Sequence, residues 1–429
     1  SEKVILSDNI KTGGSTMKRA ISVMLSAAMV LTAGSGMALT ASAAEENVTI
    51  RYGIWDSNQE PTLREIADKF EEENPGITVE IEVTPWSDYW TTLETSATGG
   101  SAPDVFWMNA PHFEMYAQGG MLSSLDDAIG ESEIASKADF PESLVDMYTY
   151  DGVWYGMPKG FDVAAVYYNK EIFDNAGVDY PTADWTWDDF VDIATQLTDT
   201  ENNIYGTGVQ LDEQAGWYNT VAMFGGSILT NDNTESGFGD PNTQAGIQCW
   251  VDLIDAGVSP TYSQLNDTGL TDMFQSGMIG MIFGGSYSLS GFMADEEFAD
   301  KFDCVELPSV DGNKATVIHG LGNVIYSQSE NQEAAAKFVE FLGGEEAMTM
   351  QAEAGIDISA RTDCQEIWAD ANPQYNLMAF MNMVDYSYPY PATLNTSAWM
   401  DPMYDEVYAA FNKDKTVEEA CNDLVGEMN

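Results

Sequence analysis

The chain has 429 residues, of which 44% are hydrophobic, so it is long enough for two or three domains with substantial cores. Its 16 Lys and Arg residues stand against 70 Asp and Glu residues, for a formal net charge of −54. Nucleic acid and anionic membranes are bound through basic patches, so this composition excludes both as partners and argues against a polyanionic ligand. A neutral ligand fits best, and a cation stays possible.

The N-terminal segment has the pattern of an export signal. Met17-Lys18-Arg19 precedes an apolar run from Ala20 to Leu31, and Ala41-Ser42-Ala43 resembles a cleavage site. This run is shorter than the roughly 20 residues that a membrane-spanning helix needs. We therefore predict a signal peptide over residues 17–43, preceded by a translated leader or added segment over residues 1–16. The mature chain is predicted to be soluble and extracellular or associated with the cell surface, or periplasmic if the host has an outer membrane.

The next elements, in chain order, predict alternating strands and helices. Ile50–Trp55 is predicted to be a strand, and Pro61 opens a helix whose apolar residues recur with helical spacing until Asn74-Pro75-Gly76 ends it. Residues 77–83 alternate as in a half-buried strand, and after a further helix residues 103–108 form a short apolar strand. Such alternation is typical of a parallel sheet flanked by helices.

The middle and the end of the chain repeat this pattern. Thr186 and Asp189 have the spacing of a capping box before a helix, and Met278–Phe283 is predicted to be a strand that ends in Gly284-Gly285. Residues 331–342 form an Ala- and Glu-rich helix with one apolar face. There is no repeat of fixed period and no low-complexity linker, which indicates lobes that are joined tightly.

The sequence offers little for metal or redox chemistry. The four cysteines, Cys249, Cys304, Cys364 and Cys421, match no zinc spacing, and we assign them no pairing. The two histidines, His112 and His319, lie far apart in the chain, which argues against a His-based triad or zinc hydrolase. Residues 231–235 resemble a calcium loop, but the Gly and the acid that an EF-hand requires are misplaced, so we interpret the segment as a surface loop. We expect no cofactor and no metal.

Several motifs in a fixed order carry a resemblance to a known family. Residues 151–158 (DGVWYGMP) and 166–170 (VYYNK) are similar to the family's "G-x-x-Y-G-x-P … Y-Y-N" segment. Residues 181–190, which contain TWDDF, are similar to its "P-x-T-W-x-E-F" helix start, and residues 102–105, 274–281 and 333–338 fit as well. Over the mature length the chain resembles the family 1, maltose-binding-protein-like, extracellular solute-binding proteins of carbohydrate ABC importers. Separately, Leu31-Thr32-Ala33-Gly34 resembles a bacterial lipobox in which Gly34 stands where the lipid-bearing cysteine would be, so lipid anchoring stays open.

The resemblance implies an α/β fold of two lobes, each a sheet flanked by helices, with the ligand cleft between them. The chain would cross between the lobes more than once. We place the N-terminal lobe at residues 44–157 plus 307–350 and the C-terminal lobe at residues 158–306 plus 351–429. The family closes about a hinge over its ligand, and the membrane permease recognises the closed form.

Sugar sites combine aromatic rings for the C–H faces with planar polar groups for the hydroxyls, and they lie beyond the carboxyl ends of strands. We therefore look for such side chains directly after strands. From the first lobe the candidates for ligand contact are Trp55, Asp56, Trp86, Asp88, Tyr89, Trp107 and Asn109. The Trp residues have lobe packing as their alternative role, and Asp56 and Asn109 have turn formation. Trp86 is expected in a polar turn.

The second lobe supplies the remaining candidates. They are Asp162, Trp217, Gly285, Ser286, Tyr287 and Arg361. By the resemblance, Tyr287 stands where the family often has a ring that stacks on sugar, and Arg361 is similar to a late arginine that reaches hydroxyls. A surface ion pair is the alternative for Arg361.

Taken together, these features predict a monomeric protein, not an enzyme, that captures a neutral oligosaccharide by hinge closure and delivers it to an ABC importer permease. A receptor for amino acids or peptides on the same fold is the first alternative, although few arginines are available to hold an α-carboxylate. A glycoside hydrolase would need two carboxylates about 5–10 Å apart, and no motif singles out such a pair. The hinge motifs and the lack of repeats argue against a surface-layer protein or adhesin.

Overall fold

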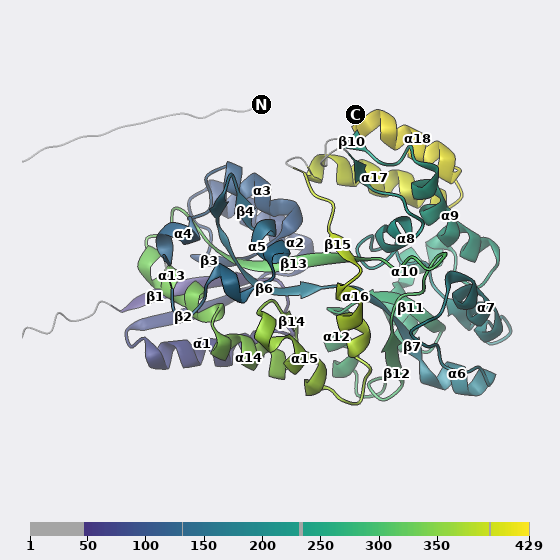
Figure 1. The fold of residues 1–429 in the computed structure, drawn as a ribbon, viewed down its shortest axis with the longest axis horizontal. Coiled ribbons are helices and arrows are strands. Elements are labelled where there is room, and N and C mark those ends of the chain that lie inside the picture. The colour runs from purple at the N-terminus through teal and green to yellow at the C-terminus, as the bar shows by residue number, and fades with distance from the viewer. Residues whose placement is uncertain (1–46, 131, 231–234, 394–395, 429) are drawn as a thin grey trace, which may run out of the picture. The chain divides into compact units, whose positions relative to one another are not determined.

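The structure is a computed structural model, and it describes residues 47–130, 132–230, 235–393 and 396–428. The predicted leader, signal peptide and Gly34 lie outside the described residues, as do residues 231–234 of the calcium-like loop. The described residues belong to one unit with two β-sheets, each of which has its own helices (Figure 1). No helix in this part of the chain is both long and apolar enough to cross a bilayer.

The first sheet has seven strands in the order β14-β6-β13-β3-β1-β2, with β15 paired to β13. They are β1 (Val48–Ile54), β2 (Ile77–Val83), β3 (Val105–Asn109), β6 (Gly156–Asp162), β13 (Thr316–Ile325), β14 (Ile358–Ser359) and β15 (Ser387–Pro389). Strands β1, β2 and β3 are parallel, as predicted, because each is followed by a helix that returns the chain. Strand β13 is antiparallel to both β3 and β6, so the sheet as a whole is mixed rather than parallel.

The second sheet has four strands in the order β12-β7-β11-β8. They are β7 (Ala164–Asn169), β8 (Tyr205–Thr207), β11 (Ile279–Gly285) and β12 (Phe302–Val305). Strand β7 is antiparallel to β11 and β12, and β8 is parallel to β11. Two small hairpins complete the strands, β4 (Thr149–Tyr150) with β5 (Val153–Trp154) and β9 (Leu229–Thr230) with β10 (Glu235–Ser236).

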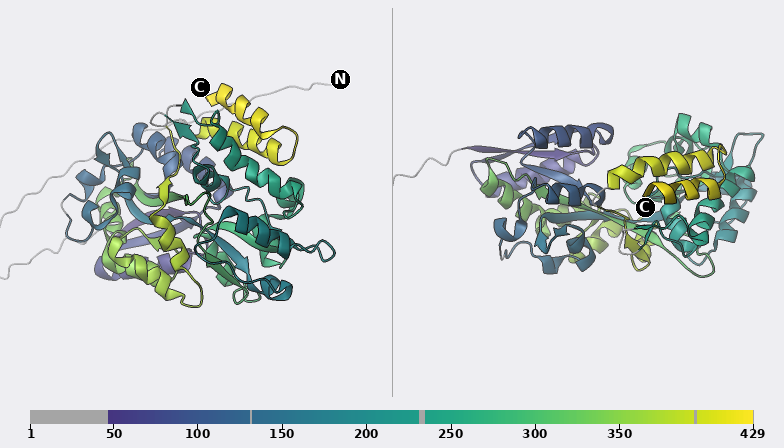
Figure 2. Two further views of the ribbon diagram at one scale, coloured as in Figure 1. Left: turned by 45° about the vertical axis from the view of Figure 1, so that its right-hand side comes forward. Right: turned by 90° about the horizontal axis from the view of Figure 1, so that it is seen from above.

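Helices flank each sheet, and the lobes are defined by which sheet the helices accompany. With the first sheet are α1 (Glu60–Glu73), α2 (Trp86–Thr98), α3 (Ala110–Gln118), α4 (Leu125–Ala128), α5 (Glu142–Met147), α13 (Gln332–Leu342), α14 (Glu345–Glu353), α15 (Gln365–Ala371) and the 3₁₀ turns at Lys137–Asp139 and Thr362–Cys364. With the second are α6 (Lys170–Ala176), α7 (Trp187–Leu197), α8 (Trp217–Met223), α9 (Pro241–Asp255), α10 (Tyr262–Thr268), α11 (Leu270–Gln275), α12 (Ser288–Ala294), α16 (Met378–Val384), α17 (Thr396–Phe411) and α18 (Val417–Met428). Figure 2 shows α17 and α18, in yellow, packed beside α9.

Local sequence signals explain the predicted helices. In α1 the buried residues are Leu63, Ile66, Ala67 and Phe70, one stripe at helical spacing. The Phe70 ring lies 5.0 Å from that of Phe338 in α13, so two helices predicted separately share one core. The capping box of α7 is confirmed, since Thr186 accepts a hydrogen bond from the Asp189 backbone and its own N–H donates to the Asp189 carboxylate.

The chain passes between the lobes more than once, and its first crossing follows β6 (Figures 1 and 2). Strand β6 ends at Asp162 and β7 begins at Ala164, so the first crossing is a single residue, Val163. The N–H of Ala164 donates to the Thr316 hydroxyl at the start of β13, 2.9 Å away. Residues Thr316–Ile318 also pair with β15. A crossing this short joins the lobes at this point without a tether.

The strand pairing differs from the predicted lobe boundaries at two places. The edge at residues 157 and 158 falls inside β6, which stays paired with β13 as far as Asp162. The edge at residues 350 and 351 falls inside α14, and β14 then pairs with β6 of the first sheet. Motif positions alone could not place these edges, because strand pairing decides which lobe holds each segment.

The four cysteines are free and buried. No group of three or more His, Cys, Asp or Glu side chains in the described ranges could hold a metal ion.

Candidate functional site

Aromatic side chains gather at the carboxyl ends of β1, β2 and β3, and we call them the aromatic group. Its members are Trp55, Trp86, Tyr89, Trp90, Trp107 and His112. The Trp55 ring is central, with edge-to-face contacts to Trp86 at 5.3 Å and to Trp107 at 4.8 Å between ring centroids. Trp86 is 53% exposed and Trp55 is half-buried, so these two indoles present the accessible faces of the group.

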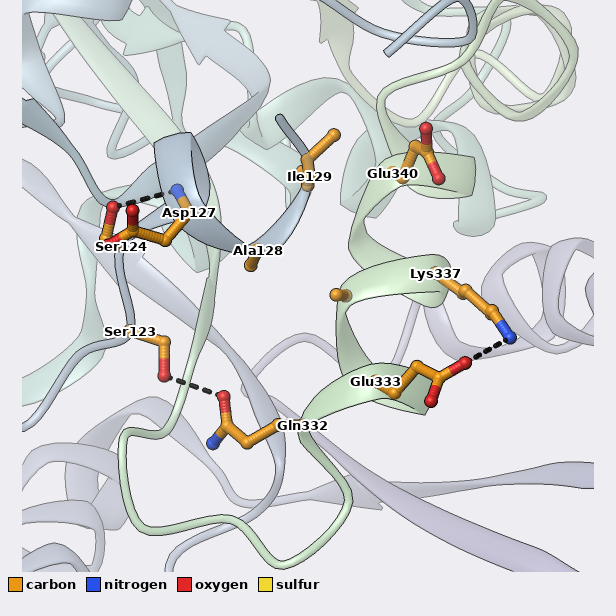
Figure 3. Close-up of a pocket in the computed structure, with 10 residues that line it drawn as sticks. Ser123, Ser124, Asp127, Ala128, Ile129, Gln332, Glu333, Lys337 and Glu340 are labelled. Carbon is orange, nitrogen blue, oxygen red and sulfur yellow. Dashed lines mark hydrogen bonds and ion pairs between the residues drawn. The ribbon is translucent and has the colours of Figure 1, made fainter. Parts of the chain in front are cut away.

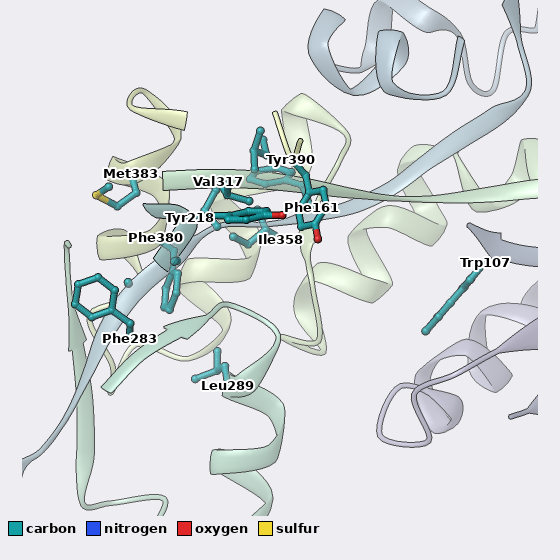
Figure 4. Close-up of a cluster of buried hydrophobic side chains, with 14 of the residues drawn as sticks. Trp107, Phe161, Tyr218, Phe283, Leu289, Val317, Ile358, Phe380, Met383 and Tyr390 are labelled. Carbon is teal, nitrogen blue, oxygen red and sulfur yellow. The ribbon is translucent and has the colours of Figure 1, made fainter. Parts of the chain in front are cut away.

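Two predicted contact residues support the group from behind. Tyr89 and Trp107 are buried, the Tyr89 hydroxyl donates to the Trp107 carbonyl at 2.8 Å, and the Trp107 indole N–H donates to the Tyr52 hydroxyl at 2.7 Å. Figure 4 shows Trp107 standing apart from the buried cluster around Tyr218 and Tyr390. The structure thus gives Trp107 and Tyr89 a role in the first lobe's core rather than at its surface.

The polar candidates of the first lobe act mainly on the backbone. Asn109 is buried and caps α3, accepting hydrogen bonds from the backbone and the ring Nδ1 of His112. Asp56 is half-buried and accepts from the Asn58 N–H at 2.8 Å, which is the turn-forming role. Asp88 lies exposed in the first turn of α2, where its charge favours the helix N-terminus. Trp86 itself begins α2, so the predicted polar turn is wrong and the residue is helical.

A buried cation lies behind the aromatic group. The Lys159 ammonium in β6 forms an ion pair with Asp357, donates to the Gln59 amide oxygen at 2.8 Å, and lies 4.6 Å from the centroid of the Trp107 ring. Burial lowers the pKa of Lys159 to about 7, and the carboxylates of Asp162 and Asp56 act in the opposite direction. No local sequence pattern indicates this pair, since 198 positions separate its members.

Carboxylates and tyrosines meet on the side of the second lobe, and we call them the acid–tyrosine group. Its members are Asp162, Asp212, Glu213, Ser286, Tyr287 and Tyr390. The Ser286 hydroxyl donates to Asp162 at 2.7 Å, the Tyr287 hydroxyl to Asp212 at 2.6 Å, and the Tyr390 hydroxyl to Glu213 at 2.5 Å. Each carboxylate is thus held by a hydroxyl, and Asp212 also accepts from the Ala215 N–H.

Burial changes the protonation of this group. It raises the pKa of Asp162 to about 6, although the Ser286 hydroxyl and the Lys159 charge oppose it. It raises the pKa of Glu213 to about 7, with Asp212 adding to the effect and Tyr390 opposing it. Burial and the neighbouring Asp212 charge thus already disfavour ionisation of these carboxyl groups, and a further anion beside them is disfavoured for the same reason.

Gly285 and Tyr287 work together at the end of β11. A Cβ on Gly285 would lie 2.1 Å from the Tyr287 ring, so only glycine lets this ring fold back over the strand end. Tyr287 keeps 36% of its surface exposed, and it is the accessible ring of the second half of the site.

Two predictions for the second lobe are corrected by burial. Trp217 begins α8, is completely buried and packs edge-to-face on Tyr218 at 4.7 Å, so it is a core residue. The Arg361 guanidinium is buried and engaged by Asp139, Asp363 and the carbonyl oxygens of Ile134 and Gly343. The alternative for Arg361 was a surface ion pair; ion pairs are observed, but the guanidinium is buried inside the first lobe and not at its surface.

Two cavities in the described part of the chain differ in whether they adjoin the candidate site. A cavity of about 830 Å³ is bounded by α3, α5 and β4 on one side and by residues 389–392, including Tyr390, on the other. A hollow of about 640 Å³ between α4 and α13 (Figure 3) contains no predicted site residue, and an ion pair between Glu333 and Lys337 borders it. Only the first of these adjoins the acid–tyrosine group.

Electrostatic contact links the two groups. Lys159 lies over the ring of Trp107, which belongs to the aromatic group. The charge of Asp162, which belongs to the acid–tyrosine group, acts to raise the pKa of Lys159 and so favours its charged form. His112 and His319, far apart in sequence, are close enough that each positive charge would disfavour the other. One side of the site therefore offers aromatic faces and the other offers oxygen acceptors, the combination that a polyhydroxylated ring requires.

Sequence reasoning missed Trp90, Lys159, Asp212, Glu213, His319 and Tyr390. For Trp90 a signal existed, because it lies at helical spacing from Trp86 in α2. The others come from loops or crossing strands whose place depends on the fold.

With this geometry established, comparison with known proteins identifies the class. The family described as bacterial extracellular solute-binding protein matches residues 56–349, well over half of the chain. A solved ABC substrate-binding protein of Listeria monocytogenes, in complex with cycloalternan, is 29% identical, covers 90% of this chain and 98% of its own, and has a TM-score of 0.83. The maltooligosaccharide ABC transporter solute-binding lipoprotein of Streptococcus pneumoniae is 23% identical over 86% of each chain. The arabinooligosaccharide-binding protein of Halalkalibacterium halodurans is 25% identical over 57% of this chain and 55% of its own.

The chain belongs to the bacterial extracellular solute-binding protein family, and its two-lobed α/β fold is that of the maltose-binding-protein-like members. The predicted resemblance is confirmed.

Proposed function

We infer that this protein captures a neutral oligosaccharide between its lobes and delivers it to the permease of an ABC importer. The observation that carries the proposal is the combination of accessible indoles at Trp86 and Trp55 with hydroxyl-held carboxylates at Asp162, Asp212 and Glu213. The two sets are linked through Lys159, which lies over Trp107 and interacts electrostatically with Asp162. The similar proteins of known ligand, named for cycloalternan, maltooligosaccharide and arabinooligosaccharide, support a glycan. Export of the chain, a monomeric state and hinge closure over the ligand are parts of the same proposal.

The arginines weigh against an amino-acid or peptide ligand. Arg51 is paired with Glu82, Arg64 with Asp68 and Glu71, and Arg361 is buried among its own partners. These are the arginines of the described ranges, and none is left to hold an α-carboxylate. Lys159 is likewise neutralised by Asp357.

The short crossing at Val163 supports closure as the mode of capture. A ligand shifts an equilibrium between open and closed forms only through extra contacts in the closed form. Here one set of contacts would come from the aromatic group on the first lobe and the other from Asp212, Glu213 and Tyr287 on the second. The closed form is the shape that the permease would recognise.

Calorimetry with maltotriose, arabinotriose, mannotriose and cycloalternan tests the proposal, with trigalacturonate as the anionic control. We expect saturable binding of at least one neutral glycan, an unchanged glycan by chromatography afterwards, and no binding of the trigalacturonate. A response to amino acids or peptides alone would overturn the substrate class. Cleavage of a bound glycan would instead favour a hydrolase, for which the raised pKa values of Asp162 and Glu213 would provide the acid.

A further inference from the structure

His319 lies in β13 at the junction of the lobes, and its two ring nitrogens have different surroundings. Nδ1 lies 2.7 Å from the amide oxygen Oε1 of Gln214. An amide oxygen only accepts hydrogen bonds, so Nδ1 carries the proton and Nε2 is the unprotonated acceptor. Nε2 is buried and has no hydrogen-bond partner in the described part of the chain.

The ring is held firmly in place. It stacks on the Tyr390 ring with centroids 4.8 Å apart, and the Tyr390 hydroxyl is fixed by Glu213. His319 is 8% exposed, and Asp162 is its register partner on β6. The ring contact with Tyr390 and the hydrogen bond to Gln214 together fix the orientation of the imidazole, and so the direction of Nε2.

The titratable groups around the ring do not satisfy Nε2. Glu213 and Asp162 are acceptors for hydroxyls, Tyr390 donates to Glu213, and His112 from α3 is bound through Nδ1 to Asn109. Burial and the proximity of His112 lower the pKa of His319 to about 3, so the ring stays neutral at ordinary pH. A buried acceptor without a donor costs free energy, and such groups in folded proteins normally have a partner.

We propose that His319 is a specificity-determining residue of the site, whose Nε2 accepts a hydrogen bond from a hydroxyl of the ligand. This assignment rests on the proposed function. A sugar hydroxyl is suited to this place because it donates to Nε2 while its oxygen can accept from another group. A carboxylate or a phosphate dianion has no proton to donate there and would meet Asp162 and Glu213, so His319 adds to the rejection of acidic sugars. The His319 ring would thus contact the ligand from β13, at the junction of the lobes.

A matched pair of variants separates ligand recognition from structural support. His319→Asn places an amide donor near the position of Nδ1, so it can keep the bond to Gln214 but loses the Nε2 acceptor. His319→Gln reaches the position of Nε2 and restores an acceptor there. We expect His319→Asn to weaken binding of the tightest glycan of the calorimetric panel by at least about tenfold, and His319→Gln by about threefold or less. The reverse order would mean that His319 serves only to hold Gln214.

The unmodified protein provides a second readout that does not depend on the folding of a variant. The chain has two histidines, so ¹⁵N spectra of the imidazole rings contain only His112 and His319. We expect the His319 Nε2 resonance to move on addition of the glycan, in the direction of an acceptor that gains a hydrogen bond, with Nδ1 still protonated. Glycan binding with an unmoved Nε2 resonance would overturn the assignment and leave the proposed function intact. Absence of binding by every glycan would overturn the proposed function, and the assignment with it.

Discussion

The two halves of the candidate site are stabilised by different kinds of interaction. The aromatic group on the first lobe is held by packing, with Trp55 in edge contact with Trp86 and Trp107 and the whole cluster seated on a buried sheet. The acid–tyrosine group, which joins residues of the second lobe to Asp162 and Tyr390 beside the first sheet, is held by directed hydrogen bonds from Tyr287 and Tyr390 to carboxylates. Packing energy is spread over area, whereas hydrogen bonding depends on each donor.

This difference predicts opposite responses to substitution. In the aromatic group, the burial of a ring decides what its substitution changes. A buried ring contributes to stability, and an exposed ring contributes to binding. In the acid–tyrosine group, the protonation of the carboxyl groups decides what a substitution changes. These groups are buried, and a buried charge costs free energy. Four predictions test this contrast, from the largest expected effect to the smallest.

Trp107→Ala should reduce the free energy of unfolding by about 4 kcal/mol, because it removes a completely buried indole and leaves a cavity. It also takes away the donor to the Tyr52 hydroxyl. Urea unfolding followed by circular dichroism measures the change. A loss below about 1 kcal/mol would mean that Trp107 belongs to the accessible half of the cluster, as originally predicted.

Lys159→Met should reduce the free energy of unfolding by about 3 kcal/mol, because it leaves the Asp357 carboxylate buried without its cation. The double variant Lys159→Met/Asp357→Leu removes both charges and should recover most of the loss. Chemical denaturation of the unmodified protein, of each single variant (Lys159→Met and Asp357→Leu) and of the double variant gives the coupling between the two residues. Equal losses in the single and double variants would show that packing, and not the unpaired charge, is responsible.

Trp86→Ala should weaken glycan binding by about tenfold, because it removes an exposed aromatic face, and should leave the melting temperature nearly unchanged. Tyr287→Ala should behave in the same way. Calorimetry and thermal scans on the same samples measure both quantities. A marked fall in melting temperature with affinity retained would assign either ring to the core.

Glu213→Gln should change how stability depends on pH. The pKa of Glu213 is raised in the folded protein from 4.5 to about 7, so the folded state binds this proton more tightly than the unfolded state does. The contribution of Glu213 to stability is therefore present at pH 4.5 and is lost as the pH rises to about 7. We expect the variant to lose less stability than the unmodified protein over that interval. Parallel curves for the two proteins would contradict the raised pKa.

Much of the fold followed from local patterns. The stripe of Leu63, Ile66 and Phe70, the alternation over residues 77–83 and the capping box at Thr186 each predicted an element that the structure contains. These signals are local because helix and strand periods decide which side chains share a face. The mixed pairing of β13 and β6 was not predictable in this way, because it depends on which segments return to the first sheet.

The site was predicted in part. Aromatic residues that follow strands were placed correctly near the sheet edge, since the carboxyl ends of parallel strands meet there. Their exposure was not predictable, and Trp107 and Trp217 proved buried where Trp86 and Tyr287 are accessible. For Arg361 the abundance of acids already favoured an ion pair, and the structure shows that outcome.

The sequence by itself determined the family, the order of the first five elements, and a composition too poor in cations to hold an anionic ligand. Only the tertiary structure decided which side chains meet. Lys159 and Asp357 are 198 positions apart, Glu213 and Tyr390 are 177 apart, and His319 and Gln214 are 105 apart. The burial and the hydrogen-bond partner of a side chain are set by residues from distant segments, and no local period carries that information.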